Sequence, residues 1–345
     1  MQNGPLVAVI GGGIAGQSAA AALSEAGALV TVFDKARGAG GRLATRREGG
    51  LQWDHGAQYF TARDPALKAR LAPLTAQGVV VPWAGIVGTL APAGFVAEDG
   101  TEPRFVGCPR MSALVGALGS GATVYSVEIR EIAPRGPLFT LTDRHGEHFG
   151  PYDAVIIATP APQAVSLLAL EPALAARVAE VEMAPCWALM LGVSGSLGLT
   201  FDGAFVAPDV AGGALSWIAR DNSKPGRADG AVETWIAHAS PDWIRTHLED
   251  MPEDVAAALL AAFTQAVGTS TRPDIVQAHR WRHAMTLRPL GQRFLLDPRR
   301  PIGACGDWCL GARIEGAFLS GHDLGLATAA RLGLVPRQAS SSASQ

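Results

Sequence analysis

Three glycines near the start of the chain have the spacing of a phosphate-binding loop. Gly11, Gly13 and Gly16 follow a short apolar run at residues 6–10 and precede an alanine-rich stretch. The first glycine permits a tight turn from strand to helix, the second lets the backbone approach a pyrophosphate, and the third lets the helix pack closely on the strand. N–H groups at the start of that helix then face the phosphates. The pattern predicts a dinucleotide-binding site.

An acidic residue stands where a dinucleotide site requires one. Residues 29–33 form a second apolar run, and Asp34 follows it directly. At the tip of a second strand, a carboxylate can accept hydrogen bonds from ribose hydroxyls. Strand, glycine loop, helix, second strand and acid are all present, and together they predict a Rossmann-like unit. This unit alone does not distinguish NAD from FAD.

The residues after the acid favour a flavin. A Gly-Gly-Arg run ends at Arg42, and the run Asp-His-Gly-Ala-Gln-Tyr-Phe occupies residues 54–60. In NAD dehydrogenases the chain normally passes from the acid straight into the next crossover. A Gly-Gly-Arg run soon after the acid, followed by a run such as that at residues 54–60, resembles the amine-oxidase-like group of FAD proteins. The resemblance implies that the arginine and the glycines line the pyrophosphate and the flavin edge.

Two later segments complete the predicted cofactor site. Residues 152–160 form an apolar strand that ends in small residues and a proline, and residues 302–308 form a short strand that ends at Asp307. In the FAD group that the chain resembles, the first of these strands returns beside strand 6–10. The acid after the second strand meets a ribityl or phosphate-side hydroxyl there.

A helix is predicted to begin near Glu315 and to run to about Arg331. Its first N–H groups are expected to face the flavin pyrimidine, which becomes anionic on reduction. The positive end of a helix dipole stabilises such an anion.

The order of these motifs predicts how the chain is divided. Since one cofactor needs segments from both ends of the chain, the chain must leave the cofactor domain and return to it. We expect an α/β fold with a two-dinucleotide-binding, Rossmann-like FAD domain, into which a substrate domain of mixed β-sheet and helices is inserted. The expected FAD domain is discontinuous and comprises residues 1–74, 106–164 and 286–335; the substrate domain comprises 75–105 and 165–285, and a Ser/Ala-rich tail at 336–345 is predicted to be disordered.

Composition excludes several classes of protein. The 345 residues are 48% hydrophobic and only 17% charged, unlike a disordered chain or a coiled coil. A net charge of −3 gives no basic field to attract nucleic acid or an anionic membrane. The four cysteines lack the spacing of a metal site, so no metal is predicted. The apolar start of the chain has no basic region before it and is broken by glycines, so we expect a soluble, cytoplasmic protein without a signal peptide.

Longer runs closely resemble bacterial renalase-like proteins of the amine-oxidase-like flavoprotein superfamily. They occupy residues 33–42, 56–64, 157–163, 217–220, 223–225 and 305–309. The resemblance extends from about residue 5 to about residue 332, and its most specific runs are Gly-Ala-Gln-Tyr-Phe-Thr-Ala-Arg-Asp and Cys-Gly-Asp-Trp-Cys. It implies a para-hydroxybenzoate-hydroxylase-like fold and non-covalently bound FAD.

The same resemblance implies a reaction. Isomers of NAD(P)H reduced at the 2- or 6-position of the nicotinamide are oxidised to NAD(P)+ by hydride transfer to flavin N5. Dioxygen or a quinone then reoxidises the flavin. A dihydropyridine needs no deprotonation to lose hydride, so the protein must mainly position the ring and exclude water. No conspicuous acid–base constellation is expected, and the sequence has none.

Motifs and resemblance together indicate the site residues. The expected FAD-binding residues are Gly11, Gly13, Ile14, Ala15, Gly16, Asp34, Lys35, Gly41, Arg42, His55, Gly56, Ala57, Gln58, Tyr59, Val127, Thr159, Asp307, Glu315, Gly316 and Ala317. On predicted strands of the substrate domain, His238, Arg282 and His283 are candidates for contacting the carboxamide or the phosphates of the substrate. A purely structural role is the alternative for each of these three.

Three rival functions remain open. An amine oxidase acting on a small amine usually carries a cage of tyrosines, but the chain has only Tyr59, Tyr125 and Tyr152. An aromatic monooxygenase of related fold carries prolines shortly after its Gly-Asp, and these are missing here. A non-catalytic flavin redox module would use Cys305 and Cys309 as its switch.

Overall fold

The computed structural model describes residues 4–100, 102–227 and 230–334, so the predicted tail at 336–345 lies outside the described residues. The chain forms two compact units. Within the described residues, the first unit comprises 4–41, 118–182 and 287–334, and the second unit comprises 42–117 and 183–286.

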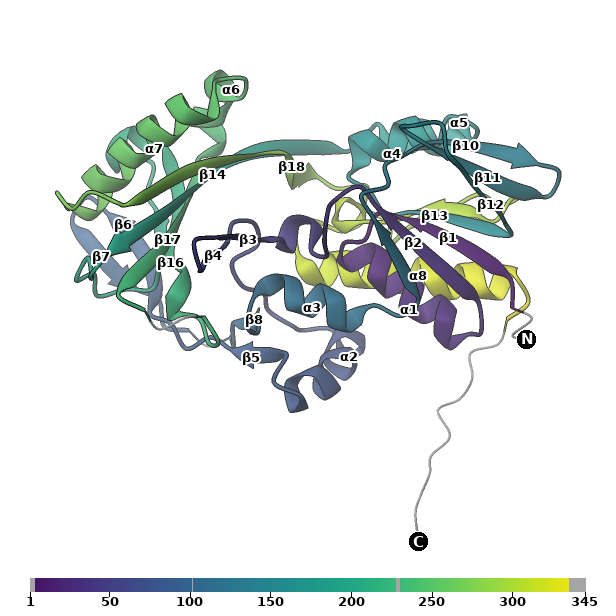
Figure 1. Ribbon diagram of the computed structural model, residues 1–345, viewed down its shortest axis with the longest axis horizontal. Coiled ribbons are helices and arrows are strands. Elements are labelled where there is room, and N and C mark those ends of the chain that lie inside the picture. Colours follow the sequence, from purple (N-terminus) through teal and green to yellow (C-terminus); the bar gives the residue numbers. More distant parts are fainter. Residues whose placement is uncertain (1–3, 101, 228–229, 335–345) are drawn as a thin grey trace, which may run out of the picture. The chain divides into compact units, whose positions relative to one another are not determined.

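The first unit is built on a mostly parallel sheet of six strands (Figure 1). Strand β1 is flanked by β2 and β13, both parallel to it. Val7 to Ile10 are buried, as expected for a strand covered on both faces. The predicted Rossmann-like α/β fold is confirmed. In sheet order the strands are β19 (Leu295–Leu296), β20 (Ile302–Ala304), β13 (Ala154–Ile157), β1 (Leu6–Ile10), β2 (Leu29–Asp34) and β9 (Ala122–Tyr125).

Two helices of the first unit, α1 (Ile14–Glu25) and α8 (Ile314–Arg331), pack closely against each other. A Cβ on Gly321 would lie 1.9 Å from the carbonyl oxygen of Ala15, and a Cβ on Gly325 would lie 2.7 Å from that of Ala19. Since both contacts advance by four residues, the two helices run in the same direction. The glycines of α8 therefore permit an approach that larger side chains would prevent.

A three-stranded antiparallel sheet completes the core of the first unit. Phe33 of β2 meets two rings of this sheet, Phe149 at 5.0 Å and Tyr152 at 6.2 Å between centroids. The strands of this sheet are β10 (Ile129–Arg135), β11 (Leu138–Asp143) and β12 (His148–Tyr152). The remaining elements of the unit are α4 (Ala161–Leu167), α5 (Pro172–Val178) and the 3-10 turn η4 (Asp307–Cys309).

The second unit is built on a seven-stranded mixed sheet. One face packs on α7 (Pro252–Val267) (Figure 1). Leu259 and Phe263 of this helix join Trp187 and Trp235 of the sheet in a buried cluster. In sheet order the strands are β18 (Ile275–Arg288), β14 (Glu182–Ser194), β17 (Val232–Ala239), β16 (Leu215–Arg220), β15 (Gly203–Val206), β6 (Val87–Ala91) and β7 (Gly94–Ala97). The outermost residues of β14 and β18 belong to the first unit.

Two short two-stranded sheets, β3–β4 and β5–β8, and several helices complete the second unit. The β3–β4 hairpin is anchored by Trp53, whose indole N–H donates to the carbonyl of Leu191 at 2.8 Å. The remaining elements are η1 (Gly41–Leu43), β3 (Thr45–Glu48), β4 (Leu51–Asp54), α2 (Pro65–Ala76), β5 (Val80–Pro82), β8 (Phe105–Gly107), α3 (Met111–Leu118), η2 (Ala211–Gly213), η3 (Asp221–Ser223) and α6 (Pro241–His247).

The limits of the compact units differ from the domain limits expected from the sequence. Residues 42–74 and 106–117 lie in the second unit, and residues 165–182 lie in the first. The anchor of Trp53 on Leu191 and the burial of Asp54 beside Asp221 give the physical reason for the first difference. The functional division into a cofactor domain and a substrate domain stays our proposal.

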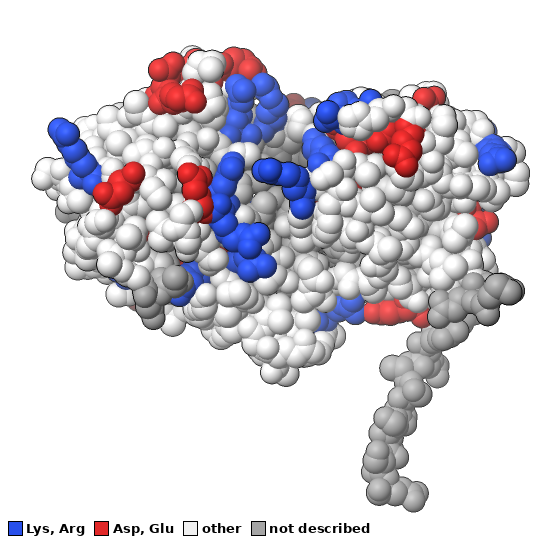
Figure 2. Space-filling model, viewed as in Figure 1, with Lys and Arg blue, Asp and Glu red and all other residues white. Residues whose placement is uncertain are grey.

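Few charged side chains are visible on the face shown in Figure 2. Most of the face in view in Figure 2 is neither acidic nor basic, in keeping with a chain that is only 17% charged. Across the described residues, the helices lack the combination of length and apolar character that crossing a membrane requires.

Candidate functional site

The glycine loop of the first unit has the backbone that its sequence predicts. Gly11 has φ +107°, and a Cβ there would lie 2.7 Å from the carbonyl oxygen of Ala158. A Cβ on Gly16 would lie 1.8 Å from the carbonyl oxygen of Gly11. At Gly13, by contrast, a Cβ would meet no described atom within 4 Å. Gly11 and Gly16 are therefore required by the fold, whereas Gly13 faces open space where a pyrophosphate could approach.

The start of α1 is suited to an anion. Gly13 is its N-cap residue, and among the described residues no side chain caps the first turn. The first turn contains no acidic residue either. The free N–H groups and the positive end of the helix dipole, at Ile14 and Ala15, are left for a ligand to satisfy.

Asp34, at the end of β2, is held by two backbone amides. Its Oδ2 accepts from the N–H of Gly12 at 2.7 Å, and its Oδ1 accepts from the N–H of Ala36 at 2.7 Å. A carboxylate has about four acceptor positions, so ribose hydroxyls can still donate to it. The N–H of Val127 donates to the carbonyl of Asp34 at 3.1 Å, which places Val127 beside the acid.

Thr159 supplies an unsatisfied polar atom. Its Oγ1 is buried and has no hydrogen-bond partner among the described residues. Its carbonyl accepts from the indole N–H of Trp308 at 3.0 Å, which ties the segment after β13 to the segment after β20. A buried hydroxyl without a partner is costly unless a ligand satisfies it. The residues therefore fit a bound dinucleotide.

Five of the predicted cofactor residues of the first unit share one position in the fold. They follow the carboxyl ends of parallel strands, which is where ligands bind in open α/β sheets. Gly41 also approaches the loop, since a Cβ there would lie 3.4 Å from Cα of Gly13. Lys35 is exposed, and Glu315, Gly316 and Ala317 form the first turn of α8. The residues that follow strand ends are Gly11 after β1, Asp34 at the end of β2, Val127 after β9, Thr159 after β13 and Asp307 after β20.

In the second unit, the predicted cofactor residues form a tight turn. The N–H of Ala57 donates to the carbonyl of Arg42 at 3.0 Å, and a Cβ on Gly56 would lie 1.9 Å from that oxygen. The Gln58 side chain donates to the carbonyl of Gly56 at 3.0 Å. The ring of Tyr59 lies 5.9 Å from those of both Trp83 and Trp217.

Four buried charged residues lie beneath this turn. Asp54, Asp221, Lys224 and Arg227 are each at most 5% exposed. Lys224 Nζ lies 2.6 Å from Asp221 Oδ1 and 3.1 Å from Gln58 Oε1, and Arg227 pairs with Asp54. Although burial favours the neutral acid, the charges of Lys224 and Arg227 keep the pKa of Asp54 below its ordinary value. Burial raises the pKa of Asp221.

No pattern in the sequence indicated this network. Lysine and aspartate are almost never fully buried unless paired. The chain has only three lysines, and one of them is the buried Lys224. The tripeptide at residues 223–225 carried the resemblance, but nothing in it showed which acids Lys224 would meet.

A group of imidazoles lies beside the same turn. The ring of His55 is 4.7 Å from that of His279 and 5.0 Å from that of Trp281, with which it stacks. Trp281 Nε1 donates to the carbonyl of His55 at 3.0 Å, and His238 Nε2 lies 3.3 Å from the same oxygen. The structure therefore brings the predicted residues His55 and His238 together. It adds His279, whose alternation with Trp281 along β18 could have indicated a shared face.

Burial keeps these imidazoles neutral. Burial lowers the pKa of His55 to about 3, with further lowering by His279 and Arg46. Burial, followed by the charge of Arg46, lowers the pKa of His279 to about 4. Burial also lowers the pKa of His238 to about 4. At neutral pH all three rings are uncharged and can donate or accept hydrogen bonds.

Arg282 is not brought to this group. Its guanidinium donates to both carboxylate oxygens of Glu249, at 2.6 and 2.9 Å, and the residue is exposed. Its neighbour His283 is half-buried and, by the alternation of a strand, lies on the same face of β18 as Trp281.

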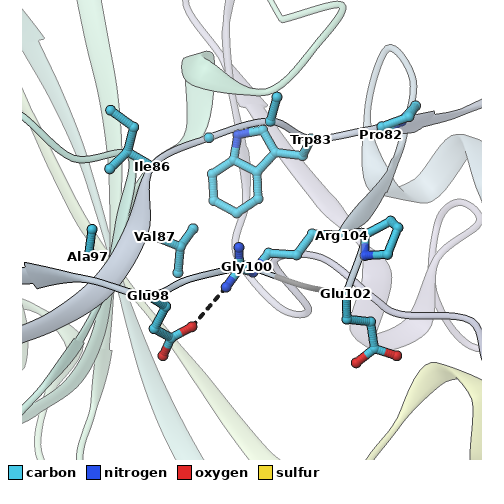
Figure 3. Close-up of a pocket in the computed structure, with 12 residues that line it drawn as sticks. Pro82, Trp83, Ile86, Val87, Ala97, Glu98, Gly100, Glu102 and Arg104 are labelled. Carbon is cyan, nitrogen blue, oxygen red and sulfur yellow. Dashed lines mark hydrogen bonds and ion pairs between the residues drawn. The ribbon is translucent and has the colours of Figure 1, made fainter.

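A cavity of about 420 Å3 lies elsewhere in the second unit (Figure 3). Figure 3 shows the Trp83 ring on one side and the Arg104–Glu98 ion pair, at 2.8 Å, on the other. Glu102 pairs with Arg63 at 2.5 Å, so the charges of this cavity are already neutralised. The residues that line it include none of the predicted site residues.

Cys305 and Cys309 are buried in the first unit. Burial raises the pKa of the Cys305 thiol well above its ordinary value and raises that of Cys309 to about 12. Thiols that remain protonated are poor nucleophiles, which disfavours their use as a redox switch.

Comparison with known proteins gives two family matches. A family model described as flavin containing amine oxidoreductase matches residues 98–324, and one described as NAD(P)-binding Rossmann-like domain matches residues 9–74. Protoporphyrinogen oxidase 2, chloroplastic/mitochondrial, from Arabidopsis thaliana is 39% identical over 72 residues. That match spans 21% of this chain and only 14% of the plant protein.

Solved structures of similar fold cover almost the whole chain. A protein assigned as a protoporphyrinogen oxidase from Exiguobacterium sp. 255-15 has a TM-score of 0.78 at 13% identity, over 96% of this chain and 100% of that one. Putrescine oxidase bound to putrescine has a TM-score of 0.64 at 15% identity, over 95% of this chain and 98% of that one. At such low identity these matches show a shared fold.

Proposed function

Since the chain belongs to the flavin-containing amine oxidoreductase family, we propose that it binds FAD non-covalently and oxidises 2- and 6-dihydro isomers of NAD(P)H to NAD(P)+. The bound flavin would supply the hydride acceptor. The observation that carries the cofactor assignment is the set of predicted residues that follow the carboxyl ends of parallel strands, beginning with Gly11 and Asp34. The contribution of Arg42 and of residues 55–59 stays a prediction from the resemblance.

The neutral imidazoles of the second unit support a dihydropyridine as substrate. His55, His238 and His279 are uncharged at neutral pH, because burial lowers their pKa values to about 3, 4 and 4. Oxidation of the substrate turns a neutral ring into a cationic nicotinamide. Neutral rings do not repel that cation, and the aromatic faces of Trp281 and His55 attract it. Of the two cations that act on these rings, Lys224 is paired with Asp221, whereas Arg46 has no carboxylate partner among the described residues.

The positions of the tyrosines also favour this substrate over an amine. Tyr152 is buried against Phe33 and Tyr125 ends β9, both in the first unit. Only Tyr59 lies in the second unit, so its residues cannot form a cage of two tyrosines. A small amine also has to lose a proton before it is oxidised, whereas a dihydropyridine does not.

The test is anaerobic mixing of the purified protein with borohydride-reduced NAD+, followed at the long-wavelength flavin band. We expect rapid bleaching by the 2- and 6-dihydro isomers, slow or no bleaching by ordinary NADH, and none by simple amines. Admission of air or of a quinone to the bleached protein then identifies the electron acceptor. Bleaching by an amine but not by the dihydro isomers would contradict the proposal.

An amine oxidase is the second candidate. The observation that favours it is the aromatic group in which Tyr59 lies 5.9 Å from both Trp83 and Trp217. A cage lined by tryptophan instead of a second tyrosine would bind an alkyl ammonium ion through its ring faces. Putrescine and monoamines in the same anaerobic assay distinguish the two functions.

A further inference from the structure

Two side-chain contacts connect the β3 segment to β18 in the second unit. Near one end, the Gln277 side chain donates to Glu48 Oε2 at 2.6 Å. Beyond the other end, Arg42 Nη1 donates to the carbonyl of Ala284 at 3.2 Å. The two segments therefore run in opposite directions. Arg46, two residues from Glu48, comes level with His279, two residues from Gln277.

Arg46 is a half-buried cation without an acidic partner. Among the described residues, its guanidinium takes part in no hydrogen bond and no ion pair. Its positive charge nevertheless acts on two neighbouring imidazoles, since it lowers the pKa values of both His55 and His279. An arginine held away from carboxylates, next to neutral rings, is suited to bind an anion.

The imidazoles next to Arg46 offer further hydrogen bonds. His55 is only 5% exposed, and its Nδ1 is buried with no hydrogen-bond partner among the described residues. The ring cannot turn freely, because it stacks on Trp281 and meets His279 edge-on, with an interplanar angle of 86°. His279 itself is half-buried and therefore reachable by a ligand. A neutral imidazole in the appropriate tautomer donates one N–H.

We propose that Arg46 and His279, with His55 behind them, bind a phosphate group of the dinucleotide substrate. The guanidinium supplies a bidentate pair of donors and the charge, and the imidazole supplies a third donor. This inference rests on the proposed function for the identity of the anion. The cofactor has its own phosphate position at the start of α1, so the cation on β3 is left to the substrate.

The test compares Arg46→Gln with Arg47→Gln in the flavin-loaded protein. Arg47 is the next residue of β3, is exposed and points to the opposite side of the strand, which makes it a matched control.

Two substrates are used: the dihydro isomers of NAD, and the corresponding isomers of N-benzyl-dihydronicotinamide, which carry no phosphate. Arg46→Gln should raise the KM for the NAD isomers by about 10- to 100-fold, the loss expected for one charged hydrogen-bond partner. It should leave the KM for the benzyl isomers unchanged, and Arg47→Gln should leave both unchanged. Equal effects on both substrates, or no effect, would overturn the proposal.

Direct binding separates failure of this inference from failure of the proposed function. Inorganic pyrophosphate and ADP-ribose are titrated by calorimetry into the three flavin-loaded proteins, with no turnover required. If the wild type does not oxidise the dihydro isomers, the proposed function fails, yet weaker binding by Arg46→Gln alone would still support the anion site. Equal dissociation constants in the three proteins would overturn it. Loss of FAD from Arg46→Gln, with unchanged pyrophosphate binding, would assign the arginine to the cofactor and overturn it too. Arg46→Lys, which retains the charge, covers the case in which the glutamine variant does not fold.

Discussion

Lys224 and Asp221 form an ion pair from which water is excluded. Their Nζ and Oδ1 atoms lie 2.6 Å apart, and both side chains are 0% exposed. Lys224 also donates to Gln58 at 3.1 Å, and Asp221 Oδ1 accepts from the backbone N–H of Asp54 at 3.3 Å. The pair therefore fixes the turn at residues 54–58, which the resemblance assigns to the flavin.

Removal of the buried ammonium should destabilise the protein strongly. Lys224→Met removes a positive charge from beside the buried carboxylates of Asp54 and Asp221. We therefore expect the free energy of unfolding to fall by about 3–5 kcal/mol. The exposed Lys68→Met is the control and should change it by less than about 0.5 kcal/mol. Adding Asp221→Asn to Lys224→Met should recover part of the loss. Urea unfolding measures all three variants, and equal midpoints for the two lysine variants would contradict the account.

The glycine loop predicts different outcomes for two alanine variants. In Gly13→Ala the new Cβ would lie in open space, and the backbone φ of −77° suits alanine. The free energy of unfolding should therefore change by no more than about 1 kcal/mol. The affinity of this variant for FAD should fall by about tenfold or more, because the new Cβ occupies the approach of the pyrophosphate. Gly16→Ala should not fold stably, because its Cβ would lie 1.8 Å from a backbone oxygen. Thermal unfolding of the flavin-free protein and flavin titration separate these effects, and normal flavin binding by Gly13→Ala would place the phosphates elsewhere.

The buried histidines predict acid sensitivity. In the folded protein burial lowers the pKa values of His55 and His238 to about 3 and 4, whereas the unfolded chain takes up protons near pH 6.5. The unfolded state thus binds more protons between these limits, so stability is complete above pH 6.5 and falls as the pH drops toward 4. Each histidine adds about 1.4 kcal/mol per pH unit to the slope. His279, whose pKa is also lowered to about 4, contributes to the same slope.

Urea unfolding between pH 7 and pH 4.5 measures that slope. His238→Gln should reduce the slope by about one proton, since glutamine does not titrate in this range. A stability that does not change between pH 6.5 and pH 5 would show that these rings are protonated in the folded protein as easily as in the unfolded chain.

The buried thiols predict slow alkylation. Because burial raises the pKa values of Cys305 and Cys309, iodoacetamide should label them in the folded protein far more slowly than after unfolding. Mass spectrometry locates the label. Cys305→Ala combined with Cys309→Ala should leave the rate of flavin reduction unchanged. Rapid labelling that depends on the redox state of the flavin would revive the redox-module alternative.

The part of the site that was predictable depends on residues close in sequence. Gly11, Gly16 and Asp34 lie within one strand–helix–strand motif. A Cβ on Gly16 would meet Gly11 of the same motif, and a Cβ on Gly11 would meet Ala158, which follows the neighbouring strand β13. The return of β13 to a place beside β1 was predictable because a Rossmann-like sheet accepts a strand there. The helix beginning near Glu315 was predictable from its length and composition.

The rest depends on how distant segments align. Asp221 meets the N–H of Asp54 across 167 positions of the chain, and His279 meets His55 across an even longer separation. The register between such segments is set by side-chain packing, for example that of Trp53 on Leu191, and a single sequence does not display it. Arg282 illustrates the same point: its strand was predicted, but the Glu249 carboxylate that pairs with it was not.

Oxidation of dihydro-NAD isomers by the bound flavin is tested by an anaerobic titration of the flavin-loaded protein with each purified isomer. Bleaching of the flavin and formation of NAD+ are followed together, the first by absorbance and the second by chromatography. The account predicts one equivalent of NAD+ for each flavin bleached by the 2- or 6-dihydro isomer. A flavin that stays oxidised in the presence of both isomers, while an amine or ordinary NADH bleaches it, would contradict the account.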